Sequence, residues 1–328
     1  MCSRFTYETG TNSYIIGRSM DWAEDTRTNL WSFPRGMERD GGVGPKSIKW
    51  TSKYGSVVAT AYDIATADGM NDAGLVVNLL YLAESEYGDA NVSSKPQLSL
   101  GAWAQYALDN FATVAEAVAA LSKEPFVMVT TPAPNGKPGT AHLALTDTSG
   151  DNAVLEYIGG KLVIHHGKQY RVMTNSPTYD QQLAINGYWK EVNGLASLPG
   201  TARASDRFAR LSWFLNASPK ESEPRLATAT AFSLSRLTSV PLGLSDPDKP
   251  NIAATIWRTV AEPSNKRYYY ESSYSPSVFW VDVTKLKLAP GSQPMKLELV
   301  NGQIYAGEVA DKFVPAKPFE FMRPGMKH

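Results

Sequence analysis

The sequence predicts an α+β fold, an αββα sandwich in which two antiparallel sheets are flanked by helix pairs. Two observations favour this fold. Strand-like segments follow one another through short turns, which is typical of antiparallel hairpins. Helical segments occur as two pairs, each placed between groups of strands. Propensity alone supports the coarser description, α+β with mostly antiparallel strands. We expect residues 1–328 to form a single domain.

The first third of the chain is expected to consist of strands and turns. Residues 3–8 and 14–19 flank five good turn formers, TGTNS, so a hairpin is predicted. Further strands are predicted at residues 47–51, 56–62 and 75–81. The last of these follows the segment GMNDAG at residues 69–74, whose composition favours a turn.

Two pairs of helices are predicted. Residues 98–111 have helical apolar spacing, and Thr113 with Glu116 forms a capping box that opens an Ala-rich helix. This second helix is expected to end at residue 121 or 122, before Pro125. The other pair is predicted at residues 206–215 and 227–237.

A β-meander is predicted between the helix pairs. Residues 140–147, 153–158 and 162–166 alternate apolar and polar side chains and are separated by turns that contain glycine. Residues 170–174 are expected to continue the meander. The last third adds strands, which we expect at residues 267–271, 278–283, 295–299 and 304–309.

Composition and charge exclude several classes of protein. The chain carries 32 Lys and Arg against 32 Asp and Glu, so its zero net charge gives no reason to expect nucleic acid or an anionic membrane as a partner. A hydrophobic share of 43% excludes a disordered chain. No apolar stretch approaches the roughly 20 residues that span a bilayer. The single cysteine excludes an internal disulfide and a thiolate metal cluster.

That cysteine stands at position 2, where removal of Met1 would make it the N-terminal residue. Its thiol is then joined to a free α-amine on the same residue. A free α-amine has a typical pKa of about 7.7–8.0 and can serve as a general base. Such a residue attacks a carbonyl without a histidine partner. The alternative is that Cys2 is a small apolar residue near a frayed end.

Five motifs occur in order along the chain. They are CSRF at residues 2–5, GRSMDW at 17–22, GMNDAGL at 69–75, TNSP at 174–177, and LPG at 198–200 with RF at 207–208. Together they resemble the choloylglycine hydrolase family of N-terminal-nucleophile amidases, which includes penicillin V acylases and bile salt hydrolases. The segments WSFP at 31–34 and WTSKYG at 50–55 are most similar to the branch found in Gram-negative bacteria.

The resemblance implies catalytic roles for six residues. Cys2 is the nucleophile, Asp21 orients its amine, and Arg18 favours the ionised thiol by charge proximity. Arg18 and Asp21 are three positions apart, so on a regular strand they should point to opposite faces. The amide of Asn175 and the backbone N–H of Tyr81 would stabilise the oxyanion. Arg207 is the remaining charged residue. Without the resemblance, these side chains fit a surface salt bridge, a turn cap and a helix-surface arginine.

Four residues are expected to contact substrate: Met20, Trp22, Trp31 and Tyr62. The default for Trp22 and Trp31 is the core, but the resemblance favours walls of an acyl pocket. No metal and no other cofactor is expected. The adjacent His165 and His166 should point to opposite faces of a strand, which is poor geometry for a metal site.

The resemblance implies a hydrolase of linear amide C–N bonds. We expect a small-molecule amide substrate, in first place penicillin V or an N-acyl homoserine lactone, with conjugated bile salts as the alternative. A different class, a non-catalytic β-rich ligand-binding protein, would make Cys2 incidental. The resemblance also implies a homotetramer, with residues 186–200 as the association loop. It places the protein in the periplasm if a leader has been removed, and in the cytoplasm if Met1 is the native start.

Overall fold

Two large β-sheets lie face to face in the computed structural model, which describes residues 2–192, 195–244, 253–275, 277–300 and 302–326. Within these two sheets, the described neighbouring strands are antiparallel except β17 and β19. The seven-stranded sheet has the order β14 (Val172–Met173), β1 (Cys2–Glu8), β2 (Tyr14–Asp21), β15 (Thr255–Glu262), β16 (Arg267–Ser272), β17 (Val278–Asp282) and β19 (Gly307–Glu308). The nine-stranded sheet has the order β13 (Lys161–His166), β12 (Asn152–Ile158), β11 (Ala141–Thr146), β8 (Val76–Tyr81), β7 (Ala65–Asn71), β6 (Ser56–Ala61), β3 (Leu30–Phe33), β18 (Met295–Leu297) and β20 (Val314–Pro315).

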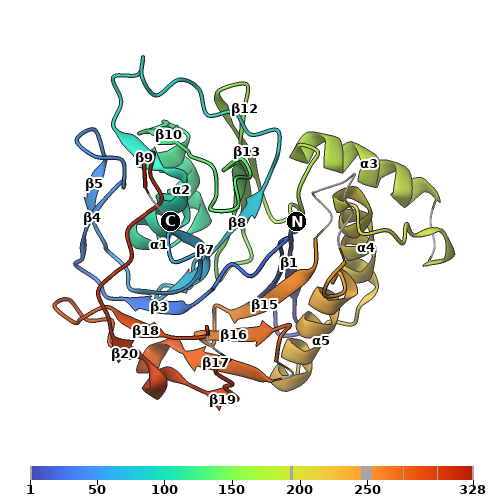
Figure 1. Cartoon of the computed structure of the whole chain (residues 1–328). Helices are drawn as coiled ribbons and strands as arrows, with labels where there is room; N and C mark the ends of the chain where they lie inside the picture. Colours follow the sequence, from blue (N-terminus) through green and yellow to red (C-terminus); the bar gives the residue numbers. More distant parts are fainter. Residues whose placement is uncertain (1, 193–194, 245–252, 276, 301, 327–328) are drawn as a thin grey trace.

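Helices cover the outer face of each sheet (Figure 1). Helices α1 (Trp103–Asn110) and α2 (Val114–Leu121) pack on the nine-stranded sheet, whereas α4 (Ala204–Ala217) and α5 (Pro224–Leu237) pack on the seven-stranded sheet. Helix α3 (Tyr179–Val192) packs on α4. The expected αββα sandwich is therefore confirmed.

Short elements complete the structure. They are the strand pairs β4 (Glu38–Asp40) with β5 (Lys49–Thr51) and β9 (Gln97–Ser99) with β10 (Val127–Val129), and the 3-10 turns η1 (Leu100–Ala102), η2 (Leu195–Ser197), η3 (Val283–Lys285) and η4 (Ala310–Lys312).

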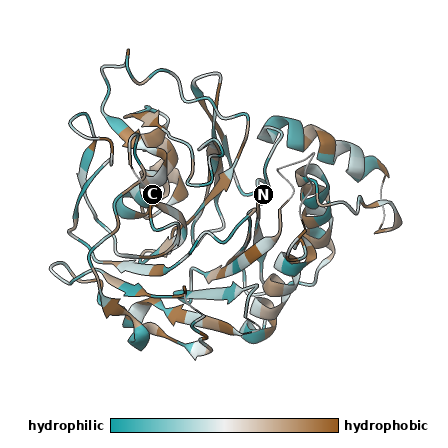
Figure 2. Cartoon of the chain, viewed as in Figure 1, coloured by the Kyte–Doolittle hydropathy of each residue, from teal (hydrophilic) through white to brown (hydrophobic). Residues whose placement is uncertain are grey.

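The helices bury one face each, and Figure 2 shows hydrophobic and hydrophilic residues side by side on them. Leu108 of α1 and Phe208 of α4 are both almost fully buried, in separate apolar clusters on the two sides of the molecule. Helix α2 begins with the expected capping box, in which the Thr113 side chain accepts from the Glu116 N–H and Glu116 accepts from the Thr113 N–H.

The β1–β2 hairpin places the N-terminus between the layers. Its register sets Cys2 opposite Met20 and Arg4 opposite Arg18. Because side chains alternate along a strand, these four residues share one face, which looks toward the nine-stranded sheet. Arg4 accordingly donates from Nε to Asn78 Oδ1 of β8, at 3.3 Å. Burial lowers the pKa of Arg4 to about 10.

Three predicted elements differ from the structure. The segment at 170–174 does not continue the meander, because β14 pairs with β1 in the other sheet. The helix predicted from residue 98 begins at Trp103, and residues 97–99 form strand β9, whose β-ladder with β10 replaces the first helical turn. Of the strand predicted at 304–309, only Gly307–Glu308 pairs with a neighbour, β17.

The predicted turn at residues 69–74 is shorter than expected. Gly69, Met70 and Asn71 belong to β7, and residues 72–75 form the connection to β8. The Asn71 side chain fixes that connection, since its Oδ1 accepts from the backbone N–H groups of Ala73, Gly74 and Leu75. Strands β3, β7 and β15 and helix α3 lie outside the sequence-based expectations.

Gly69 lets helix α1 pack closely against β7. A Cβ atom on Gly69 would lie 2.7 Å from the Val57 carbonyl oxygen, 2.8 Å from Val58 Cγ1 and 3.0 Å from Leu108 Cδ1. The glycine is therefore needed for close approach of neighbouring chain segments rather than for a turn.

Gly69→Ala is expected to lower the free energy of unfolding by about 1–3 kcal/mol, because the added methyl must push backbone and core side chains apart. Gly187→Ala is the matched control. It lies within α3, where a new Cβ meets nothing within 4 Å, and should raise the free energy of unfolding by about 0.5–1 kcal/mol. Urea unfolding followed by circular dichroism measures both. Equal stability of Gly69→Ala and the wild type would contradict this account of α1 packing.

Candidate active site

Cys2 lies at the start of β1, with 2% of its surface exposed. Its backbone nitrogen donates to Asn175 Oδ1 at 2.5 Å, and its Sγ lies 3.5 Å from Met20 Sδ. This nitrogen is an amide while Met1 is attached and becomes the α-amine when Met1 is removed. Protein contacts at one end of the hairpin thus hold both the Cys2 thiol and the nitrogen that becomes the α-amine.

Arg18 and Asp21 approach Cys2 from opposite faces of β2. Arg18 Nη2 lies 3.6 Å from Cys2 Sγ on the face between the sheets. On the other face, Asp21 Oδ2 lies 3.7 Å from Arg207 Nη1, and Asp21 Oδ1 accepts from the Thr255 hydroxyl at 2.6 Å. The alternation along β2 therefore separates the two side chains, as expected. Arg18 lies beside the Cys2 thiol, whereas Asp21 pairs with Arg207, which binds the Cys2 carbonyl.

Arg18 is held by a buried polar cluster between the sheets. Its Nη1 lies 3.6 Å from Asp68 Oδ2, and its guanidinium stacks 4.3 Å from the centre of the Trp257 ring. Asp68 also accepts from Tyr268 Oη at 2.5 Å and from Asn78 Nδ2 at 2.6 Å. Burial raises the pKa of Asp68, and the charge of Arg18 opposes this shift.

Sequence reasoning missed this cluster. The available signal was Asp68, an acidic residue beside Gly69 within a segment that proves to be a buried strand. Buried carboxylates are rare unless they are paired. The partners Trp257 and Tyr268 come from β15 and β16, almost 200 residues further along the chain, and carry no local signal of their role.

Arg207 of α4 is fully buried against the other side of the N-terminus. Its Nη1 donates to the carbonyl oxygen of Cys2 at 2.5 Å and to the Ser3 hydroxyl, and its Nη2 donates to Asn175 Oδ1 at 3.0 Å. Burial lowers the pKa of Arg207, while the charges of Asp21 and Cys2 act in the opposite direction. The Arg207 side chain is therefore buried beside Cys2 and does not lie on the helix surface.

Asn175 and Tyr81 meet next to Cys2. Asn175 Nδ2 donates to the carbonyl oxygen of Tyr81 at 2.6 Å. In the β8–β11 ladder Tyr81 lies opposite Ala141, and the next pair is joined by a bond from Leu82 N to Thr140 O at 3.3 Å. Because bonded and non-bonded pairs alternate in antiparallel ladders, the N–H and C=O of Tyr81 both point away from β11. The N–H of Tyr81 is thus available on the side where Asn175 lies.

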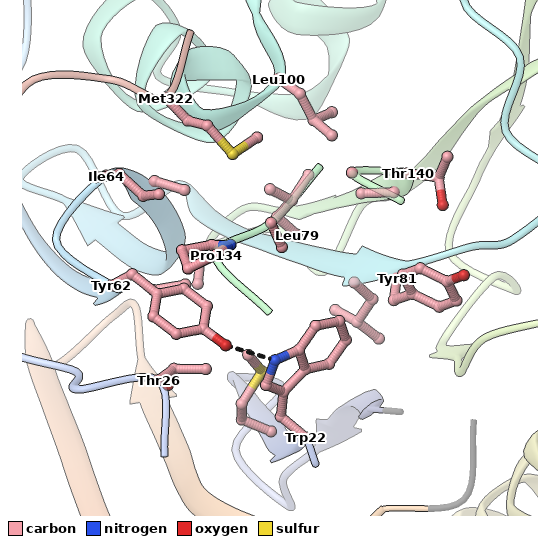
Figure 3. A pocket seen from close by; sticks show the side chains of 18 of the residues that line it. Trp22, Thr26, Tyr62, Ile64, Leu79, Tyr81, Leu100, Pro134, Thr140 and Met322 are labelled. Carbon is pink, nitrogen blue, oxygen red and sulfur yellow. Dashed lines mark hydrogen bonds between the residues drawn. The ribbon is translucent and has the colours of Figure 1, made fainter. Parts of the chain in front are cut away.

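An apolar pocket opens beside the Cys2 thiol (Figure 3). Strands β2, β7 and β8 and the turn before β7 form part of its walls. The loop at 133–141, the start of η1 and the C-terminal segment contribute as well. The lining residues are Cys2, Met20, Trp22, Thr26, Ala61, Tyr62, Ile64, Ala65, Ala67, Leu79, Leu80, Tyr81, Leu100, Ala133, Pro134, Pro138, Gly139, Thr140, Ala141 and Met322. Three of the four residues expected to contact substrate are among them.

Trp22 and Tyr62 are linked at one side of this pocket (Figure 3). Trp22 Nε1 donates to Tyr62 Oη at 2.8 Å, and Tyr62 Oη donates to Glu24 Oε1 at 2.5 Å. Burial and the neighbouring Glu24 raise the pKa of Tyr62. The Trp22 ring also packs edge-on against Tyr81, at 5.9 Å between ring centres. The orientation of the indole is therefore fixed by its contacts with Tyr62 and Tyr81.

Trp31 does not line the pocket, contrary to the expectation from the resemblance. It is 3% exposed and packs against Phe33 and Phe319, with ring centres 5.9 Å and 5.6 Å away. Its Nε1 donates to Asp63 Oδ1 at 2.9 Å. Its side chain packs into the apolar cluster under α1. Trp31 therefore occupies a core position, which is the default for a tryptophan on a strand.

The two adjacent histidines of β13 each pair with a different acidic residue. His165 Nε2 lies 2.8 Å from Asp180, whereas His166 Nε2 lies 2.7 Å from Asp151. Within the described ranges, no group of three or more His, Cys, Asp and Glu side chains could hold a metal ion. In the same part of the chain, no helix has both the length and the apolar character needed to cross a bilayer.

Comparison with known proteins gives consistent results. The sequence profile described as linear amide C–N hydrolases, choloylglycine hydrolase family, matches residues 2–300. The chain is 51% identical to a penicillin V acylase from Pectobacterium atrosepticum, over 98% of this chain and 92% of that protein. It is 53% identical to a penicillin V acylase from Agrobacterium tumefaciens of known structure, with a TM-score of 0.92 over 98% of this chain and all of that one.

A conjugated bile acid hydrolase from Clostridium perfringens, solved as a variant, has the same fold at 21% identity. The TM-score is 0.79, over 94% of this chain and 98% of that one. The family profile covers residues 2–300, and the two penicillin V acylases are matched over 92% and 100% of their own length. The chain therefore belongs to the choloylglycine hydrolase family of linear amide C–N hydrolases.

Proposed function

We propose that this hydrolase is a penicillin V acylase, which removes the phenoxyacetyl group from its amide. The observation that carries the proposal is the Cys2 thiol at the wall of a small apolar pocket, with Asn175 and the Tyr81 N–H beside it. The pocket volume is about 120 Å³. A protein cavity of about 150 Å³ accepts benzene, so this pocket suits one aromatic ring better than a steroid.

In the proposed mechanism, processed Cys2 transfers its thiol proton to its own α-amine and its sulfur attacks the amide carbonyl carbon. The carbonyl electron pair moves to oxygen, where the Tyr81 N–H and the Asn175 amide stabilise the charge. The C–N bond breaks as the α-ammonium gives its proton to the leaving amine, which leaves a thioester. Water attacks the thioester, and its proton passes through the amine to sulfur, which releases the acid.

The charged neighbours have distinct roles in this proposal. Arg18, 3.6 Å from Cys2 Sγ, stabilises the thiolate electrostatically. Arg207, paired with Asp21, holds the backbone of Cys2, because it binds the Cys2 carbonyl and the Asn175 Oδ1 that accepts from the Cys2 nitrogen. An arginine–carboxylate pair on each side of β2 thus orients the nucleophile and its base separately.

Two further expectations stay predictions. The first is self-association through residues 186–200, where Tyr188 and Leu195 are 61% and 59% exposed and offer apolar surface to another copy. The second is a periplasmic location.

Among penicillin V, a long-chain N-acyl homoserine lactone, and glycine- and taurine-conjugated bile salts, penicillin V should have the highest kcat/KM. The physical reason is the ring-sized pocket. Release of the amine from each substrate by the same enzyme preparation measures the ranking. Hydrolysis of bile salts alone would contradict the proposed substrate while leaving the amidase class intact.

Cys2→Ala is expected to abolish hydrolysis of penicillin V, because no other group supplies the attacking atom. Protein that retains Met1 should also be inactive, since its Cys2 nitrogen is an amide and cannot accept a proton. Intact-mass measurement identifies the N-terminus, and thermal unfolding controls for folding of both forms. Activity of either form comparable to the processed wild type would refute the mechanism.

Asn175→Ala is expected to lower kcat by about 10²–10³-fold, the cost of one lost oxyanion donor. Asn175→Asp is the matched variant, because it keeps the Oδ1 acceptor for Cys2 and Arg207 but removes the N–H donors. Steady-state kinetics with penicillin V should show the loss in kcat for both variants. A near-normal kcat in Asn175→Asp would show that the amide donor is not needed.

A further inference from the structure

The pocket has an open side and a closed end. Pro134 and Pro138, on the loop between β10 and β11, are exposed beside Trp22. At the other end, Ile64, Leu100 and Met322 are 7%, 4% and 7% exposed. Figure 3 shows these three side chains on the side of the pocket away from Trp22. Met322 belongs to the segment that follows the last strand, β20.

Two backbone hydrogen bonds fix Met322 at this closed end. Its N–H donates to the carbonyl oxygen of Ile64 at 2.8 Å. Its carbonyl oxygen accepts from the Ser99 hydroxyl, at the end of β9. The C-terminal segment is thereby bound to the turn before β7, which contributes Ile64 to the pocket wall. It is also bound to β9, which directly precedes Leu100, another residue of the pocket wall.

Aromatic packing anchors the residues just before Met322. Phe319 lies 5.6 Å from the Trp31 ring and 5.4 Å from the Phe321 ring, measured between ring centres. Phe321 packs against Gly42, where a Cβ atom would lie 2.8 Å from Phe321 Cβ. Trp31, which lies outside the pocket, therefore holds the segment that closes it.

The wall facing Met322 is equally well fixed. Tyr62 and Asp63 form a turn with positive φ, at 56° and 51°. Burial alone would raise the pKa of Asp63, but hydrogen bonds from Thr60, Lys296 and Trp31 hold it below its ordinary value. This anchored carboxylate fixes the turn and so the place of Ile64 beside Met322.

We propose that Met322 sets the maximum length of the acyl group. An acyl chain whose carbonyl carbon lies at Cys2 and whose tail fills the pocket would end against the Met322 thioether. Methionine is flexible and apolar, so its side chain can adapt to an aromatic ring or to a short alkyl chain. Main-chain bonds and the two phenylalanines hold the segment, so the Met322 side chain extends from a fixed backbone into the closed end of the cavity. The inference rests on the proposed function, since the acyl group must occupy this pocket.

The experiment uses one amine acylated with straight chains of increasing length, together with penicillin V. Met322→Ala should shift the optimum of kcat/KM to longer chains, with a gain of up to about fourfold for each further methylene that becomes buried. Met322→Trp should shift the optimum to shorter chains and reduce hydrolysis of penicillin V. Met326→Ala, in the same segment but outside the pocket lining, is the matched control and should leave the profile unchanged.

A second measurement covers variants with low activity. Calorimetric binding of the free acids to Cys2→Ala, with and without Met322→Ala, should show the same shift in length preference. An unchanged preference in both assays, with normal hydrolysis of short chains, would overturn the role of Met322 and leave the proposed function standing. If the wild type hydrolyses neither penicillin V nor any amide of the series, the proposed function fails, and the inference fails with it.

Discussion

The site depends on one constraint, the alternation of side chains along the β1–β2 hairpin. Cys2 can be flanked by two buried arginines only because β2 sends Arg18 into the space between the sheets and Asp21 to the opposite face, toward α4. Each arginine is matched by a carboxylate, Asp68 for Arg18 and Asp21 for Arg207. Buried charges are costly unless they are paired and hydrogen-bonded, so the surrounding sandwich must supply both partners.

The buried polar cluster explains why the inner faces of two sheets, usually apolar, carry charge here. Asp68, Asn78, Tyr268 and Trp257 come from four different strands of both sheets and meet at Arg18. The ion pair and hydrogen bonds of this cluster restrict the arrangement of the groups that it contains. The position of the guanidinium relative to the Cys2 thiol is therefore built into the packing of the two sheets.

Local sequence patterns predicted the local structure well, but they did not reveal contacts between residues far apart in the chain. The hairpin, the capping box at Thr113 and the meander follow from neighbouring residues, and the resemblance located Cys2 and its partners. Gly69 was misjudged because its role, close packing under Leu108, depends on a helix far along the chain. Trp31 was misjudged because a tryptophan on a strand looks the same in a core and in a pocket. Met322 had no signal, since its position depends on Ser99 and Ile64.

The central claim is that the sulfur of an N-terminal Cys2 carries the acyl group during turnover. The most direct measurement is intact-protein and peptide mass spectrometry of enzyme quenched in acid during turnover of penicillin V. The account predicts a phenoxyacetyl adduct on the sulfur of Cys2, in protein that lacks Met1, which disappears as substrate is exhausted. An adduct on another residue, or turnover by protein that still carries Met1, would contradict it.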